Sequence, residues 1–300
     1  MASEPVALIY NPAAGSRLQW RRPRVEEVAA ALRANGASPQ LLPTRGPGDG
    51  TRRGREAGGR FAVVAVFGGD GTVNEVINGL VAARSPARLL ILPGGSVNVL
   101  ARDLRIPLDP CRAAALLREG MERRLFLGRA GQRYFALMAG VGPDASIIRA
   151  LGLGPLKRTL GPLAFFLEGL RHALFYRFPR LTVRSEAGTL HGHFLVVGKS
   201  PGYAGWFSLT PGADPGQVGF QVALCTSRCG LKYFYFLALA LAGALPRSRD
   251  FVYFNASRLD VSADSPVCVQ VDGELHDLLP TEFTCDGTSL RLLVPLPPRK

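Results

Sequence analysis

A continuous apolar run that ends in a glycine-rich turn limits the possible folds of this chain more than any other feature. Residues 61–67 have the composition of a strand buried on both faces. The turn at residues 68–72 reads Gly-Gly-Asp-Gly-Thr, and residues 73–83 continue with helical spacing. A buried strand, a tight turn and a helix in this order indicate one unit of a parallel sheet with helices on both faces.

The same alternation of strand and helix extends over the first 124 residues. Short apolar runs predict strands, and amphipathic stretches predict helices. The predicted strands lie at 6–10, 38–42 and 89–92, and the predicted helices at 25–34, 97–103 and 112–119, with a polar helix or turn at 51–59. These elements predict an α/β domain at 1–124.

Short strands with period-2 alternation dominate from residue 125 onward. They are bounded by Gly, Pro or Asp, which is typical of antiparallel sheets, and two helical stretches interrupt them. The predicted strands lie at 125–129, 134–140, 181–185, 192–199, 218–225, 250–253, 258–262, 267–272 and 290–296, and the helices at 161–176 and 231–245. We therefore expect a C-terminal antiparallel β-sandwich domain with inserted helices at 125–300, and the last strand, about 289–297, could belong to either domain.

Three small-residue turns follow three of the predicted parallel strands, at 11–16, 68–72 and 93–98. The carboxyl ends of parallel strands meet at one edge of a sheet, so these turns should converge. Glycine allows backbone N–H groups to approach a ligand, and a helix N-terminus favours phosphate. Asp70 would repel phosphate, which suggests a Mg²⁺ or proton-transfer role. The plainer alternative is a glycine-rich turn in which Asp70 caps the helix.

An acidic turn, Asp272-Gly273-Glu274, ends a predicted strand far along the chain. Two solvated acids in a turn are the simpler interpretation of this segment alone. The alternative is that the second domain supplies an acid to the nucleotide site, because a hydroxyl nucleophile needs a base to accept its proton during phosphoryl transfer.

In combination these segments resemble the diacylglycerol kinase and sphingosine kinase family, in its bacterial lipid-kinase branch. The expected fold is then an α/β N-terminal domain with a parallel sheet, of the NAD kinase/diacylglycerol kinase-like type. The resemblance rests on Asn11-Pro12 with Gly15, on the turn at 68–72 with Asn74-Glu75, on residues 95–98 with Ala101-Arg102, on residues 140–145, and on Asp272-Gly273-Glu274.

The resemblance implies a lipid kinase that uses ATP and Mg²⁺. Asp272 would be the general base, with Glu274 beside it at the nucleotide or acting as the base itself, and Asp70 would help to hold Mg²⁺ and phosphate. The residues implied to contact ATP are Asn11, Pro12, Gly15, Thr44, Gly68, Gly69, Asp70, Gly71, Thr72, Asn74, Ser96 and Glu274.

Residues 214–219 resemble a segment of this family that often carries several acids and a structural Mg²⁺. Asp214 is retained and is the candidate metal ligand, but Pro215 and Gly219 stand where acids are common. The departures at Pro215 and Gly219 argue against a second, structural metal site. Val99 stands where many members have Asp, so any role of that acid is absent here.

Charge and cysteine usage bear on partners and location. The net charge of +13 favours anionic surfaces, so we expect a lipid substrate at an anionic membrane surface. An odd number of cysteines, five, indicates reduced thiols and a cytoplasmic location. The longest apolar stretch, 233–245, is too short to span a bilayer, and residues 151–176 could form a membrane-surface helix or cover the β domain. We expect peripheral membrane association; a homodimer remains open.

Two other functions stay open at this stage. An NAD-kinase-like enzyme for a soluble metabolite shares the turn at 68–72, but no Asn-Asn-Glu segment follows it here. A non-catalytic membrane-binding or regulatory protein on the same fold stays open because of the missing acids at Val99, Pro215 and Gly219. The retained Asp70, Asp272 and Glu274 count against it. Nucleic-acid binding is not expected, because the sequence carries no recognised module.

Overall fold

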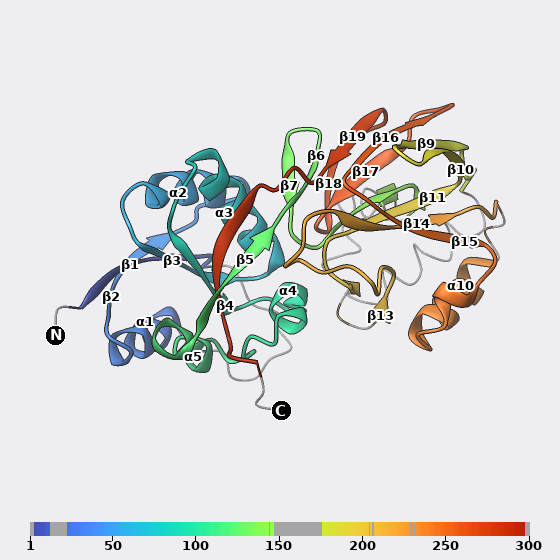
Figure 1. The fold of residues 1–300 in the computed structure, drawn as a ribbon. Helices are drawn as coiled ribbons and strands as arrows, with labels where there is room; N and C mark the ends of the chain where they lie inside the picture. Colours follow the sequence, from blue (N-terminus) through green and yellow to red (C-terminus); the bar gives the residue numbers. More distant parts are fainter. Residues whose placement is uncertain are drawn as a thin grey trace. The chain divides into compact units, whose positions relative to one another are not determined.

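The computed structural model describes residues 3–12, 23–143, 145–146, 176–203, 205, 207–228, 230 and 232–297. The chain divides into two compact units (Figure 1). The first unit comprises Met1–Leu127 with Thr288–Lys300, and the second comprises Gly128–Gly287. The expected boundary after Arg124 falls inside a strand of the first unit, and the strand expected at about 289–297 lies in the sheet of that unit.

The first unit is built on a six-stranded sheet of order β2-β1-β3-β4-β20-β5. Neighbouring strands are parallel from β2 to β20, and only the edge strand β5 runs antiparallel to its neighbour β20. The strands are β1 Glu4–Tyr10, β2 Ala37–Pro43, β3 Val63–Gly68, β4 Arg88–Pro93, β5 Met121–Phe126 and β20 Ser289–Val294. The expected parallel sheet is thus confirmed, with one antiparallel edge.

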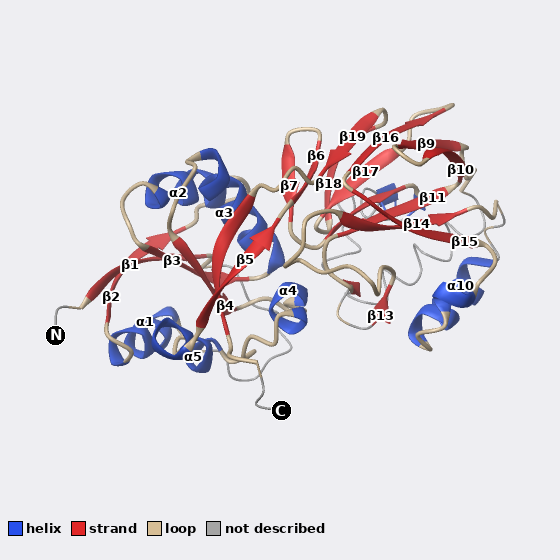
Figure 2. Ribbon diagram, in the orientation of Figure 1, coloured by secondary structure: helices blue, strands red, loops and turns tan. Residues whose placement is uncertain are grey.

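Helices cover both faces of this sheet, as Figure 2 shows for α2 and α3 on one face and α1 and α5 on the other. Strands β1, β3 and β4 are buried on both faces because of this double cover, which explains their continuous apolar runs. The helices are α1 Val25–Ala34, α2 Asp49–Gly58, α3 Asp70–Ala82, α4 Val99–Asp103, α5 Pro110–Ala113 and α6 Leu116–Glu119.

Helices α2 and α3 approach closely at two glycines. A Cβ atom at Gly54 would lie 2.7 Å from the carbonyl oxygen of Val76, and one at Gly79 would lie 2.2 Å from that of Thr51. Only glycine allows the two backbones this separation. The crossing fixes α3, and with it the turn that precedes α3.

The second unit is an antiparallel sandwich of two six-stranded sheets, of order β10-β9-β16-β19-β6-β7 and β15-β14-β11-β8-β17-β18. Inward-facing residues of both sheets share one core, which includes Val183, Phe283, Leu195 and Val269. The first sheet contains β6 Gly128–Ala130, β7 Arg133–Phe135, β9 Leu181–Ser185, β10 Gly188–Gly192, β16 Arg258–Ala263 and β19 Thr281–Thr284. The second contains β8 Met138–Val141, β11 Phe194–Gly198, β14 Phe220–Cys225, β15 Phe251–Ala256, β17 Cys268–Val271 and β18 Glu274–Leu278.

Helix α10, Lys232–Leu241, packs on the outer face of the second sheet, where Phe236 meets Phe251 edge to face with ring centroids 5.0 Å apart. A 3₁₀ turn, η1 Leu245–Arg247, follows it, so the helix predicted at 231–245 is confirmed in part. A further hairpin is formed by β12 Gly202–Tyr203 and β13 Phe207–Ser208. The helix predicted at 161–176 lies outside the described residues, apart from Tyr176.

Several strand predictions are wrong in the second half of the chain. The single strand expected at 125–129 is two strands, since β5 ends at Phe126 and β6 starts at Gly128. Residues 121–124 are exposed on an edge strand, so they carry no apolar alternation. Strands β10, β18 and β19 were not predicted; β10 and β18 are largely exposed, and the hydrophobic signal is correspondingly weak.

Candidate functional site

The ends of the parallel strands in the first unit are joined by backbone hydrogen bonds that continue the sheet into the turns. The N–H of Thr44 donates to the carbonyl oxygen of Tyr10 at 2.8 Å, and the N–H of Asn11 donates to that of Phe67 at 3.3 Å. The N–H of Gly94 donates to the carbonyl oxygen of Gly68 at 2.8 Å. The predicted convergence of the turns at one edge of the sheet is therefore confirmed for the described residues.

The turns after β3 and β4 touch through glycine backbones. A Cβ atom at Gly95 would lie 2.5 Å from the Cα atom of Gly69 and 2.7 Å from Oδ1 of Asn98. Asn98 holds its own turn, because its Oδ1 accepts from the N–H of Gly95 at 2.8 Å and its Nδ2 donates to the carbonyl oxygen of Gly95 at 2.9 Å. The two turns thus meet backbone to backbone at Gly69 and Gly95, a separation that only glycine allows.

The sequence predicted Asp70 within the turn. In the structure Asp70 instead begins α3, with Gly69 at the N-cap position. Its carboxylate accepts from the N–H of Val99 at 3.0 Å and from the N–H of Leu100 at 3.3 Å. Asp70 therefore caps the neighbouring helix α4. Burial raises the pKa of Asp70, and these backbone hydrogen bonds oppose that effect.

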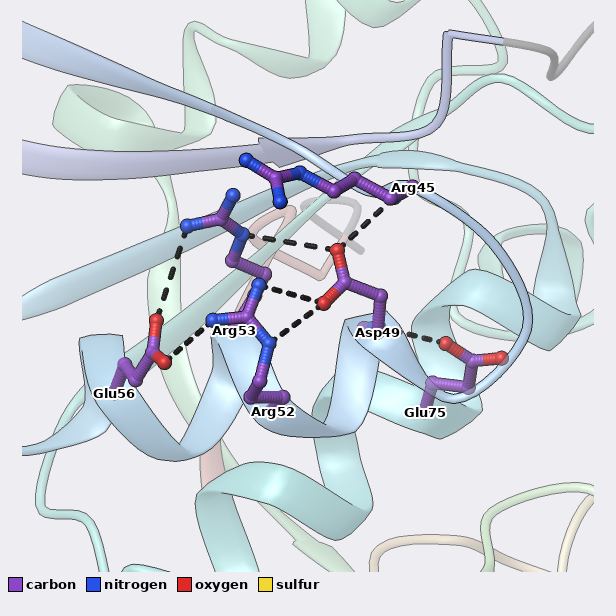
Figure 3. A network of polar contacts seen from close by, with 7 residues as sticks. Arg45, Asp49, Arg52, Arg53, Glu56 and Glu75 are labelled. Carbon is purple, nitrogen blue, oxygen red and sulfur yellow. Dashed lines mark hydrogen bonds and ion pairs between the residues drawn. The ribbon is translucent and has the colours of Figure 1, made fainter.

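Glu75 has a similar role one turn further along α3. Its Oε1 accepts from the N–H of Gly48 and its Oε2 from the N–H of Gly50, both at 2.8 Å. These N–H groups lie at the start of α2, so Glu75 caps α2 from the side (Figure 3). A Cβ atom at Gly50 would lie 2.5 Å from Oε2 of Glu75, so the close approach requires glycine there.

The other predicted nucleotide residues differ in how accessible they are. Ser96 and Pro12 are exposed, and Asn11, Thr44 and Thr72 are half-buried. Asn74 is 2% exposed, and its Oδ1 accepts from Nδ2 of Asn78 at 3.3 Å, so its amide faces the interior of the protein. Gly15 lies outside the described residues. Contact of these residues with ATP stays a prediction.

In the second unit Asp272 is the first residue of a two-residue turn between β17 and β18. Asp272 has φ +48° and Gly273 has φ +84°, the left-handed pair that a tight Asp-Gly hairpin requires. The Asp272 carboxylate accepts from three successive N–H groups: Oδ2 from Ala136 at 3.0 Å, and Oδ1 from Leu137 at 3.0 Å and Met138 at 2.9 Å. Asp272 is 8% exposed, so this carboxylate holds the junction of β7 and β8.

Glu274, two residues later, is more accessible. Its side chain is 44% exposed, and its Oε2 lies 2.5 Å from a guanidinium nitrogen of Arg133 on β7. The two acids of this turn therefore differ: Asp272 is engaged by backbone donors, and Glu274 faces outward beside one cation.

Asp214 does not have the surroundings of a metal ligand. Its Oδ1 accepts from the N–H of Gly216 at 2.7 Å and its Oδ2 from Nε2 of Gln217 at 3.3 Å. The carbonyl oxygens of this turn face the ammonium group of Lys199. Among the described residues no group of three or more His, Cys, Asp or Glu side chains could hold a metal ion. Asp214 as a metal ligand is therefore not favoured by these contacts.

The sequence interpretation missed the roles of Glu75, Arg133 and Lys199. Glu75 was recognised as part of the motif, but its partners are glycine N–H groups 27 and 25 residues away. Lys199 ends a strongly apolar predicted strand, and a lysine in that place was the one available signal of a buried cation.

Residues 5–130 match the family described as the diacylglycerol kinase catalytic domain. The chain is 27% identical over 280 residues to a diacylglycerol kinase of Bacillus subtilis (strain 168), covering 92% of this chain and 91% of that protein. It is 26% identical over 279 residues to a diacylglycerol kinase of Staphylococcus aureus (strain JH9), covering 92% and 88%.

A crystal structure of a diacylglycerol kinase from Bacillus anthracis str. Sterne has the same fold, with a TM-score of 0.77, 20% identity and 97% coverage of both chains. The family match and the two relatives support a phosphotransferase that acts on an alcohol group. Residues 5–130 therefore belong to the diacylglycerol kinase catalytic-domain family, and the relatives that share nearly the whole chain are bacterial diacylglycerol kinases.

Proposed function

We propose that this protein transfers the γ-phosphate of ATP to a hydroxyl of a membrane lipid such as diacylglycerol or a long-chain base. The observation that carries the proposal is the backbone contact between the two glycine turns at Gly69 and Gly95, which lies beside the N-terminus of α3. The relatives named diacylglycerol kinase support a lipid acceptor.

On the nucleotide side, the first N–H groups of α3 have no partner four residues earlier in the helix. We propose that these groups, with the exposed hydroxyl of Ser96, bind the phosphates of ATP. Mg²⁺ would arrive with the phosphates, since it keeps several waters and takes few protein ligands in such sites. Backbone donors surround the Asp70 carboxylate, which supports a positioning role for Asp70 rather than direct binding of Mg²⁺.

On the acceptor side, we propose Glu274 as the base and Asp272 as the residue that positions it. A general base needs an accessible lone pair within reach of the hydroxyl proton. Glu274 is exposed, whereas the Asp272 carboxylate already accepts three backbone hydrogen bonds. The rigid two-residue turn would then hold Glu274 in a fixed orientation.

We also propose that the protein acts at the cytoplasmic surface of an anionic membrane. The net charge of +13 supports attraction to such a surface, and the four cysteines described are free thiols. In the described part of the chain, no helix has the length and apolarity needed to cross a bilayer.

The test is transfer of labelled phosphate from Mg·ATP to a panel of lipids in mixed micelles, with NAD as a soluble acceptor. Glu274→Gln and Asp272→Asn are assayed beside Glu282→Gln. Glu282 forms an ion pair with Arg258 at 2.7 Å in the same unit, so its substitution breaks a comparable pair elsewhere. We expect Glu274→Gln to lower kcat by about 10²- to 10⁴-fold and Glu282→Gln to leave it unchanged.

Transfer of labelled phosphate to a lipid supports the whole proposal if this transfer is lost in Glu274→Gln. Label in NAD alone would overturn the lipid acceptor. A folded Asp272→Asn variant that loses activity while Glu274→Gln keeps it would assign the base to Asp272 instead.

A further inference from the structure

A lysine ammonium lies inside the second unit. Lys199 directly follows β11 and is 0% exposed. Its Nζ donates to the carbonyl oxygen of Gln217 at 2.6 Å, to that of Gly219 at 2.7 Å and to that of Asp214 at 3.4 Å. Three carbonyl oxygens of one turn therefore converge on one cation.

A buried cation is costly unless its surroundings replace the lost water. Here the turn at 214–219 supplies the oxygens, and Cys285 and the Asp214 carboxylate add favourable interactions with the ammonium. An ammonium group has three donors, which matches the three carbonyl oxygens. The turn thus resembles an ion-binding loop whose cation is the ammonium group of Lys199.

We propose that Lys199 is the internal cation of the second unit and that its ammonium replaces a structural divalent metal in the turn at 214–219. Mg²⁺ requires close to six oxygen ligands at about 2.0–2.1 Å. The turn offers one carboxylate, which is bonded to Gly216 and Gln217, and its carbonyl oxygens are already held by a positive charge. A divalent ion does not fit beside this ammonium.

Lys199 also connects this turn to the acidic turn of the proposed active site. The backbone N–H groups of Lys199 and Ser200 donate to the carbonyl oxygen of Leu137 at 2.8 and 3.0 Å. The N–H of Leu137 in turn donates to Oδ1 of Asp272 at 3.0 Å. Because the ammonium fixes Lys199 on the turn at 214–219, and the Lys199 backbone supports the strand junction that binds Asp272, we treat Lys199 as a positioning residue for Asp272; this second part of the inference rests on the proposed function.

The experiment is chemical rescue of Lys199→Ala. The substitution deletes the atoms of n-propylamine, so n-propylammonium is the matched ligand and 1-propanol is the uncharged control. A cavity of about 280 Å³ lined by Asp214, Gln217 and Gly219 gives access from the same turn. We expect a lower Tm, a fall in kcat of about 10- to 100-fold with little change in KM for ATP, and recovery of both with n-propylammonium alone.

Two outcomes would overturn the assignment. One is rescue by 1-propanol as effective as by n-propylammonium, which would make the effect one of volume. The other is a rise in the Tm of the unaltered protein when Mg²⁺ or Ca²⁺ replaces EDTA without nucleotide. If Lys199→Ala does not fold, Lys199→Met takes its place. This variant keeps most of the side-chain length but removes the charge, and its Tm is compared with that of the unaltered protein. Because Tm requires no lipid acceptor, this test is independent of the proposed activity.

A second, independent observation is a cationic hollow of about 620 Å³ in the same unit. It is lined by Arg177, Arg180, Arg228, His191 and His193, with Asp264 as the one acid. Within the described residues none of the three arginines forms an ion pair, although most other ion pairs of the chain use arginine. Three unpaired guanidinium groups around one hollow repel one another unless an anion lies between them.

We infer that this hollow binds a phosphate group, carried by a lipid headgroup or free in solution. The His193 ring is held at the wall of this hollow, since its Nδ1 faces the carbonyl oxygen of Phe178 at 2.8 Å. Guanidinium groups form paired hydrogen bonds with phosphate oxygens, which suits a ring of arginines. The site is built entirely from the second unit.

Binding to vesicles of phosphatidylcholine with and without phosphatidylglycerol tests this site. The triple variant Arg177→Gln, Arg180→Gln, Arg228→Gln is compared with Arg184→Gln, Arg247→Gln, Arg249→Gln, which removes the same charge from exposed arginines outside the hollow. We expect at least a tenfold loss of affinity for the first variant only. Equal losses in both would overturn the site. Competition by inorganic phosphate would assign it to free phosphate, and no competition would assign it to the headgroup.

Discussion

Each unit carries one motif aspartate that is held by backbone N–H groups, but the two are held for different reasons. In the first unit Asp70 caps a helix, because its carboxylate meets the free N–H groups at the start of α4. In the second unit Asp272 binds three N–H groups where two strands of opposite sheets meet. A helix start always presents free donors, whereas the strand junction presents them only because the chain changes sheets between β7 and β8.

The comparison teaches that an acid within a sequence motif can bind backbone donors while its neighbours are the groups proposed to contact the substrates. Beside Asp70 these neighbours are the first N–H groups of α3 and the exposed Ser96, and beside Asp272 the neighbour is Glu274. The difference also predicts that replacing Asp272 lowers the free energy of unfolding more than replacing Asp70, since water can reach a helix start more easily than a buried strand junction.

The largest effect is expected for Asp272→Ala. Three N–H groups at a buried junction would lose their acceptor, and each unpaired buried donor costs about 1–3 kcal/mol. We expect the free energy of unfolding of the second unit to fall by about 3–5 kcal/mol, measured by urea denaturation. Asp272→Asn keeps one acceptor oxygen and should cost less than half as much. Equal stability of the alanine variant and the unaltered protein would contradict the assigned role.

The next effect concerns the contact between the two glycine turns. Gly95→Ala places a methyl group 2.5 Å from the Cα atom of Gly69, so the turns must separate. We expect a loss of about 1–3 kcal/mol in stability and weaker binding of ATP, measured by thermal unfolding and calorimetry. Gly59→Ala is the control, because a Cβ atom there meets nothing within 4 Å. Unchanged ATP affinity in Gly95→Ala would argue against phosphate binding at this surface.

A smaller effect is expected where α3 caps α2. Glu75→Gln removes the charge from two short hydrogen bonds to Gly48 and Gly50, which should cost about 1 kcal/mol. The control is Glu56→Gln. Glu56 pairs within α2 with the exposed Arg52 and, at 3.8 Å, with the half-buried Arg53, and these pairs should contribute less than about 0.5 kcal/mol (Figure 3). A larger cost for Glu56→Gln in chemical denaturation would reverse this order.

The smallest effect is a change in pH dependence at Asp70. Burial raises the pKa of Asp70 above its ordinary value of 3.8, so the folded state retains this proton to higher pH than the unfolded chain. The contribution of Asp70 to stability is thus complete below pH 3.8 and is lost as the pH rises through the raised pKa. In Asp70→Asn the free energy of unfolding of the first unit should no longer fall with rising pH over this range. An unchanged profile would mean that the carboxylate is better solvated than its burial indicates.

The elements that sequence patterns predicted well are those whose signal is local. The run at 61–67 is apolar because both faces of β3 are covered, and the glycines after it are required by a backbone contact. Strands β5, β10 and β18 were mispredicted or missed because exposed edge strands have little apolar pattern. The partners of Asp70, Glu75, Asp272 and Lys199 lie from 15 to more than 130 residues away, and no pattern within a short window encodes them.

The position of β20 has a consequence for how the chain is made. This strand lies inside the first sheet, between β4 and β5, yet all of the second unit is translated before it. While the ribosome synthesises residues 128–287, the first sheet lacks an interior strand and leaves an edge of β4 and an edge of β5 unpaired. The second unit can therefore complete its fold first, and the sheet of the first unit closes only when residues 289–294 emerge. A nascent chain arrested before that point would carry exposed strand edges, the form of the protein that chaperones should bind most strongly.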